Sequence, residues 1–470
     1  MSSKSPAFTL TLALLLASTF CACASKSASV TVDWKTDLGP IKVMNAANNG
    51  PKGATSDQTR SNFLAYKALR VPYVRNHDAA FMTMQHSDDI TAIFPNFDAD
   101  ENDPKSYDFA LTDGNMKIIQ AAGSKPFFRL GQTIEHWTKK YGVNPPRDFA
   151  KWARICEHVI RHYNEGWADG FRMGIEYWEI WNEPDNLPTA DGRQSPTWTG
   201  TETQFHELFA TTAKHLKTCF PNLKIGGPAL SFDLNWADRF LGYCQRNSVP
   251  LDFFSWHLYH DGHDGWYANK SAKIREVLDR HGYRQCESIM DEWNYVSDWG
   301  AGWIYSLEVE SGRLNLKGAA YSAAVMCDNQ NAPVDMLMYY DMRVGSPMNG
   351  IFDSISLLPL KGYYPFYAWS KLRDLGMQVK ATADDGDIRV VAARSADGRH
   401  GAALVVRYNN DNNVVAGREV RLNVPGVSLA GARCHLTDIA RTYSEVPLSV
   451  QEDGTATLLL LPWSFALIEW

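Results

Sequence analysis

Two acidic segments of this 470-residue chain have the composition of a catalytic pair. WEIWNEPD contains Asn182, Glu183 and Pro184, and the later SIMDEWN contains Glu292. Cleavage of a glycosidic bond needs two carboxyl groups at one site, because one protonates the leaving oxygen and the other attacks the anomeric carbon. We therefore predict that Glu183 is the general acid/base and that Glu292 is the nucleophile. Asp291, directly before Glu292, is the alternative nucleophile.

Eight short apolar runs are expected to position these residues. Runs of nearly continuous apolarity are typical of strands that are buried on both faces, and they occur at 41–44, 71–75, 125–130, 176–181, 223–227, 251–256, 287–293 and 334–340. Residues with helical periodicity separate them, at 57–69, 147–163, 202–218, 266–281 and 313–327. This alternation predicts an α/β fold, a (β/α)8 TIM barrel over residues 38–372 whose strand ends converge on one mouth. An open doubly wound sheet is the alternative, but no GxGxxG follows the first run.

The pattern changes after about residue 373. Short β-rich runs at close spacing, with turns between them, predict an all-β sandwich over residues 373–470. The runs are 388–394, 401–408, 418–424, 456–461 and 465–470. An earlier run, SVTVDW, leads us to expect that residues 25–37 form an N-terminal strand that joins this sandwich.

The first 24 residues have the pattern of a signal peptide. Lys4 is followed by an apolar stretch that is too short to span a bilayer, and small residues suited to cleavage come after it. We expect an exported protein, periplasmic, secreted or held at the cell surface, without a membrane span. Cys23 is the alternative attachment point for a lipid anchor.

Composition argues against several classes of partner. The formal net charge is −7, which is unlike the basic surface of a nucleic-acid binder. No HExxH, P-loop or GxSxG motif occurs. The cysteines after residue 24 form no CxxC pair, which argues against a structural zinc site; they are Cys156, Cys219, Cys244, Cys286, Cys327 and Cys434. We expect neither a cofactor nor a metal.

The motif WEIWNEPD, with the later DEWN, resembles the clan of retaining barrel glycosidases. Within that clan it is most similar to glycoside hydrolase family 39, which contains β-xylosidases and α-L-iduronidases. The family's signature, Trp-x-Phe-Glu-x-Trp-Asn-Glu-Pro-Asp/Asn, is met from Glu179 to Asp185, while Glu176 and Trp178 depart from it. The resemblance implies an exo-acting retaining hydrolase of a β-xyloside-like side chain of an oligo- or polysaccharide, with a carboxyl separation of about 5–5.5 Å.

Further residues at the predicted mouth fit this chemistry. Arg75 and His77 lie in VRNHD, which is similar to an Arg-x-His of the family, and we predict both as substrate-binding residues. Arg75 could also keep Glu292 ionised through a charge-assisted pair. By resemblance, Asn182 would bond the 2-hydroxyl of the sugar.

The sixth strand ends in SWHLYH, which contains His257 and Tyr259. We predict that Tyr259 donates a hydrogen bond to Glu292 and that His257 binds a sugar hydroxyl. Trp293 is predicted to bind substrate by stacking on a sugar ring, together with three tryptophans that fall in the predicted loops, Trp266, Trp299 and Trp303.

Two other functions remain open at this point, an endo-acting glycanase of the same clan and a barrel that binds glycan without cleaving it. Fold alone decides neither, because barrels host many chemistries. The identity of the sugar is also open. A uronate would call for a cation at the site, for which Arg129, Lys270 and Arg343 are the candidates.

Overall fold

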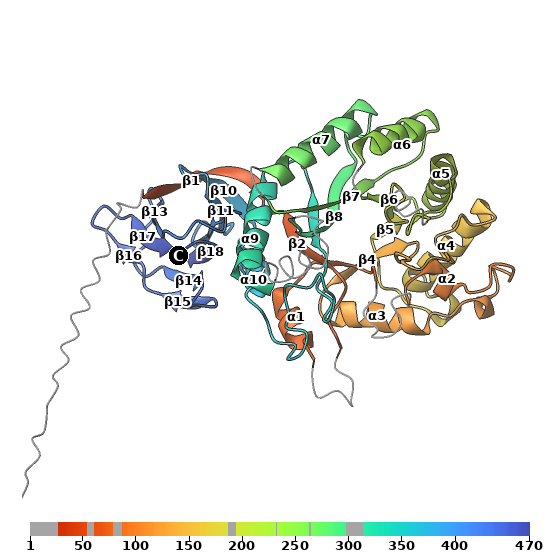
Figure 1. Cartoon of the computed structure of the whole chain (residues 1–470), viewed down its shortest axis with the longest axis horizontal. Coiled ribbons are helices and arrows are strands. Elements are labelled where there is room, and N and C mark those ends of the chain that lie inside the picture. The colour runs from red at the N-terminus through yellow and green to blue at the C-terminus, as the bar shows by residue number, and fades with distance from the viewer. Residues whose placement is uncertain are drawn as a thin grey trace, which may run out of the picture.

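In the computed structural model the chain forms a closed barrel and a separate curled sheet, which lie side by side (Figure 1). The structure describes residues 27–53, 61–78, 87–186, 194–231, 233–262, 265–297 and 314–470. The predicted signal peptide, with Cys23, lies outside these ranges, and so do Trp299 and Trp303. None of the described helices is both long and apolar enough to cross a membrane.

The barrel has eight parallel strands in chain order, and the last pairs with the first. This confirms the predicted TIM barrel and excludes the open sheet. The strands are β2 (Val43–Asn48), β3 (Tyr73–Arg75), β4 (Lys125–Leu130), β5 (Tyr177–Ile180), β6 (Lys224–Leu230), β7 (Phe253–His260), β8 (Glu287–Tyr295) and β9 (Met336–Tyr339).

Helices form much of the connections between these strands and lie outside them (Figure 1). In α4 the buried residues recur at steps of three and four, as Trp152, Cys156, Val159 and Tyr163 show, so one stripe faces the barrel. The α-helices are α1 (Phe63–Leu69), α2 (Ile90–Ile93), α3 (Ala110–Ala121), α4 (Phe149–Asn164), α5 (Glu202–Cys219), α6 (Leu234–Arg246), α7 (Trp266–Arg280), α9 (Leu316–Gln330) and α10 (Tyr363–Leu375), and short 3-10 helices cover Pro104–Ser106 and Trp167–Asp169.

Side chains fill the inside of the barrel in layers. The lower layer is an apolar cluster of Ala46, Phe127, Tyr177, Phe253, Ile289, Met336 and Met338. Because side chains alternate across a strand, residues two positions further on also point inward, one layer higher. Glu179 follows Tyr177 in this way and Asp291 follows Ile289. Arg75 occupies the same layer on β3, so the layer nearer the mouth is charged.

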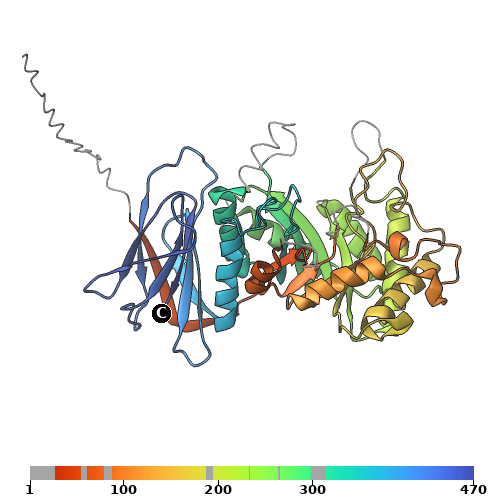
Figure 2. The same ribbon diagram turned by 90° about the horizontal axis from the view of Figure 1, so that it is seen from below.

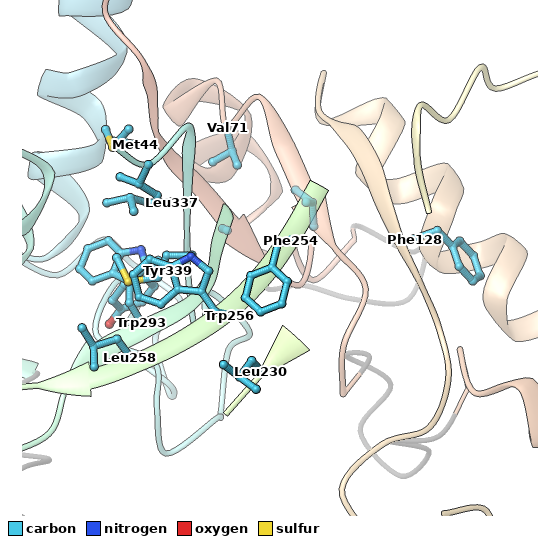
Figure 3. Packing of buried hydrophobic residues seen from close by; sticks show 14 of the residues in the cluster. Met44, Val71, Phe128, Leu230, Phe254, Trp256, Leu258, Trp293, Leu337 and Tyr339 are labelled. Carbon is cyan, nitrogen blue, oxygen red and sulfur yellow. The ribbon is translucent and has the colours of Figure 1, made fainter. Parts of the chain in front are cut away.

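The opposite faces of the same strands pack against the helices. On β7, the alternate residues Phe254, Trp256 and Leu258 belong to the large apolar cluster between the strands and the helices (Figure 3). His257 lies between two of them in sequence, and the alternation therefore turns it toward the inside of the barrel.

The curled sheet contains ten strands, in the order β15-β14-β18-β12-β11-β10-β1-β13-β17-β16. They are β1 (Ala28–Pro40), β10 (Met377–Ala383), β11 (Ile388–Arg394), β12 (Gly401–Arg407), β13 (Arg418–Asn423), β14 (Arg433–Thr437), β15 (Ser444–Val446), β16 (Ser449–Val450), β17 (Ala456–Leu460) and β18 (Ser464–Glu469). Together with the barrel this confirms the predicted fold class. β1 pairs antiparallel with β10 and parallel with β13.

The central strands of this sheet are buried on both faces. Leu404 and Leu467 belong to the cluster that includes the barrel helices, whereas their neighbours Val405 and Ile468 belong to the core within the curled sheet. Helices α9 and α10 stand between the barrel and the sheet (Figure 2). This explains why these strands read as continuous apolar runs rather than alternating ones.

Candidate active site

Arg75, at the end of β3, is the centre of the charged layer. Its Nε donates to Glu179 Oε2 at 2.7 Å, its Nη1 to Glu292 Oε1 at 2.7 Å, and its Nη2 to Asn182 Oδ1 at 2.7 Å. The side chain is fully buried, and every guanidinium nitrogen has a protein partner. The predicted pairing with Glu292 is therefore present. The predicted contact with substrate is not available, because these bonds direct the guanidinium to the protein.

A β-bulge explains why two consecutive acids reach this arginine. Strand pairing with β7 joins Trp256 to Met290 and His257 to Glu292, so that Asp291 is the extra residue. Regular alternation would turn Asp291 and Glu292 to opposite faces, and a bulge re-aims one of them. Asp291 Oδ2 lies 3.1 Å from Arg75 Nε, while Glu292 reaches Nη1.

Glu292 is held by donors on both of its oxygens. Besides Arg75 on Oε1, the Tyr259 hydroxyl donates to Oε2 at 2.5 Å, as the sequence predicts. Burial raises the pKa of Glu292 to about 7, although His257 and Arg75 oppose the shift. The donors thus limit the rise in the pKa rather than reverse it, and the carboxylate forms as the pH passes neutrality.

Glu183 follows β5 on a strained turn. Its φ is 48° and that of Trp181 is 76°, in the left-handed region that costs free energy for side chains other than glycine. Hydrogen bonds hold the turn, among them Glu183 N–H to Ala229 O at 2.9 Å and the Thr197 hydroxyl to Glu183 O at 2.6 Å. Asn186 Nδ2 donates to Glu183 Oε2 at 2.7 Å. The turn therefore fixes the Glu183 carboxyl in one direction.

His257 lies between the two carboxyl groups. Its Nδ1 is 2.7 Å from Glu183 Oε1 and 3.5 Å from Glu292 Oε2, and its Nε2 is 3.5 Å from Asp291 Oδ1. Burial disfavours its charged form, but Glu292 and Asp291 outweigh burial and raise the pKa of His257 well above its usual value. The ring nitrogens face carboxylates, so the predicted bond from His257 to a sugar hydroxyl is not supported by this geometry.

Glu183 and Glu292 face each other at short range. One oxygen of each, together with a ring nitrogen of His257, lie within 4.8 Å of one another. The exposed fractions of the two residues are only 7% and 3%, so little water competes for them. The same three atoms could surround a metal ion, but the Arg75 guanidinium bound to Glu292 makes the position unfavourable for a cation.

Behind Glu292, the carboxyl groups of Glu179 and Asp291 both lie against Arg75 Nε, at 2.7 and 3.1 Å. Two carboxylates at the same guanidinium nitrogen repel each other, which favours a proton on one of them. Burial raises the pKa of Glu179 to about 8 even though Arg75 lowers it. Burial also acts against the Asp291 carboxylate, but Arg75 and His257 hold the pKa of Asp291 below its usual value. Glu179 is thus the protonated partner at neutral pH, and Asp291 is a buried support rather than a nucleophile that faces the mouth.

Two predicted binding residues keep polar atoms without a hydrogen-bond partner among the described residues. They are Asn182 Nδ2 and both ring nitrogens of His77. Burial, Arg75 and Arg129 hold the pKa of His77 well below its usual value, so the ring is neutral. His77 Nε2 lies 3.7 Å from Glu292 Oε1. These atoms can serve hydroxyl groups of a ligand next to the carboxyl pair.

The prediction that Trp293 binds substrate is wrong. Trp293 follows the inward-facing Glu292 within β8, and its ring turns the other way, into the apolar cluster that Figure 3 shows. It is fully buried, with its ring centroid 5.3 Å from that of Tyr339 and 6.1 Å from that of Tyr321. The ring is a structural contact between β8 and helix α9.

The candidate cations for a uronate already face acids. Arg129 Nη2 bonds Asp89 at 2.7 Å, and Arg343 Nη2 lies 3.2 Å from Asp341. Lys270 lies in α7, on the outside of the barrel. Of the three, Arg129 keeps two buried nitrogens, Nε and Nη1, without a hydrogen-bond partner among the described residues.

Sequence reasoning missed two residues that support the site, Glu179 and Asn186, and it gave Asn48 only as an amide for sugar hydroxyls. Asn48 donates to Asp291 O at 2.6 Å and accepts from Arg75. The alternation of side chains along β5 could have identified Glu179. It lies two residues after Tyr177, and therefore it also points into the barrel. The sequence gives no such signal for Asn186, because only the turn after Glu183 brings its side chain back to the Glu183 carboxyl.

The fold and the facing carboxyl groups define a parallel eight-stranded barrel with a paired-acid site at the carboxyl ends of its strands. Residues 23–342 match the model for glycosyl hydrolases family 39, and the chain belongs to this family. It is 30% identical over 213 residues to a β-xylosidase of Geobacillus stearothermophilus, covering 42% of this chain and 38% of that protein. It is 26% identical over 248 residues to a β-xylosidase of Caldicellulosiruptor saccharolyticus, covering 50% and 46%. The chain thus spans less than half the length of these relatives.

Solved structures share the whole architecture. A glucosidase from Croceicoccus marinus has a TM-score of 0.75 at 21% identity, covering 94% of this chain and 98% of that one. A monomeric β-xylosidase from Caulobacter crescentus CB15 has a TM-score of 0.68 at 15% identity, covering 94% and 99%. At these identities the likeness shows the fold, including the curled sheet beside the barrel.

Proposed function

We propose that this protein is a retaining glycoside hydrolase that removes xylose-like residues from the ends of glycan side chains. The observation that carries the proposal is the approach of Glu183 and Glu292, whose nearest oxygens lie within 4.8 Å. A retaining enzyme needs its carboxyl groups about 5–5.5 Å apart, whereas an inverting enzyme needs about 6.5 Å or more to admit a water molecule. The two named β-xylosidase relatives support the choice of sugar.

In the first half of the reaction, Glu292 attacks the anomeric carbon while Glu183 gives its proton to the departing oxygen. Arg75 and Tyr259 direct the Glu292 carboxylate toward the site, and Asn182, held by Arg75, presents its free Nδ2 to the sugar. The leaving group departs with the proton from Glu183, and the sugar stays bonded to Glu292.

In the second half, Glu183 takes a proton from water, which attacks the anomeric carbon and releases Glu292. Asn186 and His257 keep the Glu183 carboxyl in place through both steps. Two inversions at the same carbon return the sugar in its original configuration.

The test uses the full chain and a nitrophenyl β-D-xyloside. We expect release of nitrophenol, and proton NMR of the first product should show β-xylose before mutarotation. A 2-fluoro xyloside with a good leaving group should inactivate the enzyme and add one sugar to the peptide that contains Glu292. α-Xylose as the first product, or a label on a different peptide, would contradict the retaining assignment.

We further propose that the chain is exported and that residues 1–24 are removed. The proposal rests on Lys4 and the short apolar stretch that follows it. N-terminal sequencing of protein recovered outside the cytoplasm should begin near residue 25. A chain that retains Met1 would contradict export, and a lipid on Cys23 would identify the alternative attachment.

A further inference from the structure

Three side chains that can bind a transition metal meet on the outside of the barrel, away from the candidate active site. Glu157 comes from α4, and His215 and Cys219 come from α5, which packs against it. One ligand atom of each lies within 4.8 Å of the other two. This is a set of one oxygen, one nitrogen and one sulfur.

The helical spacing prearranges this cluster. His215 and Cys219 are four residues apart, so they lie on the same face of α5, and Cys219 Sγ is 3.9 Å from His215 Nε2. His215 Nε2 is also 2.6 Å from Glu157 Oε2. Because Cys219 is the last residue of α5, the partial negative charge of the helix end favours a cation beside it.

These distances fit a zinc ion that takes the place of protons. Zinc binds nitrogen and oxygen at about 2.0–2.2 Å and sulfur at about 2.3 Å, in a tetrahedron whose ligand atoms are roughly 3.4 Å apart. The 2.6 Å between His215 Nε2 and Glu157 Oε2 would lengthen on binding, and the 3.9 Å between Cys219 Sγ and His215 Nε2 would shorten. The side chains of His215 and Glu157 are 30% and 14% exposed, so an ion can enter from solvent.

An ion pair alone accounts for part of this arrangement. Arg161 Nη2 bonds Glu157 Oε1 at 2.7 Å and leaves Oε2 to His215. The Arg161 side chain is 33% exposed, so water screens its charge, unlike that of the fully buried Arg75 beside Glu292. That pairing does not require a thiol beside the imidazole. Among the described cysteines, Cys219 is the one that is not fully buried.

We propose that Glu157, His215 and Cys219 form a zinc site that joins α4 to α5 and leaves the fourth position to water. The sequence argument against a structural zinc site rested on the absence of CxxC pairs, and it did not consider ligands that come from two helices. Binding replaces the Cys219 thiol proton, which is released to solvent. The site lies outside the catalytic machinery, so it acts on stability rather than on turnover.

The experiment titrates Co²⁺ and then Zn²⁺ into the chelator-treated full chain. Cobalt should give visible bands of a tetrahedral site and a thiolate-to-cobalt charge-transfer band, and one equivalent of zinc should remove them. Because the Glu183–His257–Glu292 cluster contains no sulfur, a thiolate band separates the two locations. Zinc should also raise the melting temperature and slow alkylation of the peptide that contains Cys219.

The variants His215→Ala and Cys219→Ser should each weaken zinc binding by about 10-fold to 100-fold or more. His158→Ala is the matched control, because His158 is a half-buried histidine of α4 outside the cluster, and it should bind zinc as the wild type does. Absence of a thiolate band, or equal zinc affinity in all three variants, would overturn the proposal.

Discussion

Two layers of side chains inside the barrel are both buried, but one is apolar and the other is charged. The lower layer, which contains Phe253 and Ile289, is apolar and touches mainly itself. The layer above it gathers Glu179 and Asp291 around Arg75. Both layers exclude water and fill the space between the same strands.

The difference shows what each layer is for. Apolar packing stabilises the barrel without directed hydrogen bonds, because the burial of apolar surface is favourable by itself. Burying several acids beside one guanidinium gives weak net stability, because desolvation offsets the attraction. The charged layer is therefore best explained as the support that orients Glu292. Substitutions that remove the carboxyl groups of the reaction, or the bonds that orient them, should change turnover, and substitutions in the lower layer should change stability.

The largest effect is expected for Glu292→Ala. Without the nucleophile, turnover of a nitrophenyl xyloside should fall by about 10⁴-fold or more. The fold should persist, because Glu179 and Asp291 still pair with Arg75. Steady-state kinetics and circular dichroism check both statements. Asp291→Ala is the comparison. If that variant stayed folded but lost turnover, while Glu292→Ala kept near-normal rates, the nucleophile would be Asp291.

Glu183→Ala should slow the enzyme by about 10²-fold to 10⁴-fold, depending on the leaving group. A poor leaving group such as an alkyl alcohol needs the proton that Glu183 supplies, whereas dinitrophenol does not. The ratio of kcat/KM for the two kinds of substrate measures this. Equal losses on both would mean that Glu183 acts on structure rather than as the acid.

The sequence predicted the elements of the barrel well because its strands are buried on both faces. The runs at 125–130 and 287–293 coincide closely with β4 and β8. Helices α2, α3, α6 and α10 were not predicted. The positions of Glu183 and Glu292 followed from motifs at strand ends, and the structure brings them together.

The parts that could not be predicted depend on geometry that no pattern encodes. Strict alternation would separate Asp291 from Glu292, and only the bulge in β8 turns both toward Arg75. Trp293 looked like a residue of the mouth because it adjoins Glu292. Its side chain belongs to the opposite face of the strand, so adjacency in sequence was misleading there.

Ile289→Ala tests the lower layer. The lost side chain leaves a cavity among Phe127, Tyr177 and Phe253, and the free energy of unfolding should fall by about 2–5 kcal/mol. Urea denaturation measures this, and kcat of the folded enzyme should match the wild type. A large loss of kcat without a loss of stability would show that the two layers are not separable.

Tyr259→Phe tests how the mouth sets the pKa of Glu292. Because Glu292 must be ionised to attack, kcat/KM should fall about 10-fold per pH unit below its pKa of about 7. The Tyr259 hydroxyl stabilises the carboxylate, so its removal should move this acidic limb to higher pH. The pH profile on a dinitrophenyl xyloside gives the shift. A limb that stays in place would show that Tyr259 does not support the charge.

Glu179→Gln is expected to have the smallest effect, since a neutral amide copies a protonated acid: its oxygen can accept from Arg75 and its nitrogen can donate to Asp291. Turnover should be close to that of the wild type.

The pKa of Glu179 is raised to about 8 in the folded chain, so between about pH 5 and pH 8 the folded wild type holds a proton that the unfolded chain has lost. Wild-type stability should therefore decline relative to the variant by about 1 kcal/mol per pH unit across that window, and the two should be parallel outside it. Urea unfolding at several pH values measures the difference. A constant difference from pH 5 to pH 8 would mean that Glu179 is already ionised in the folded chain across that window.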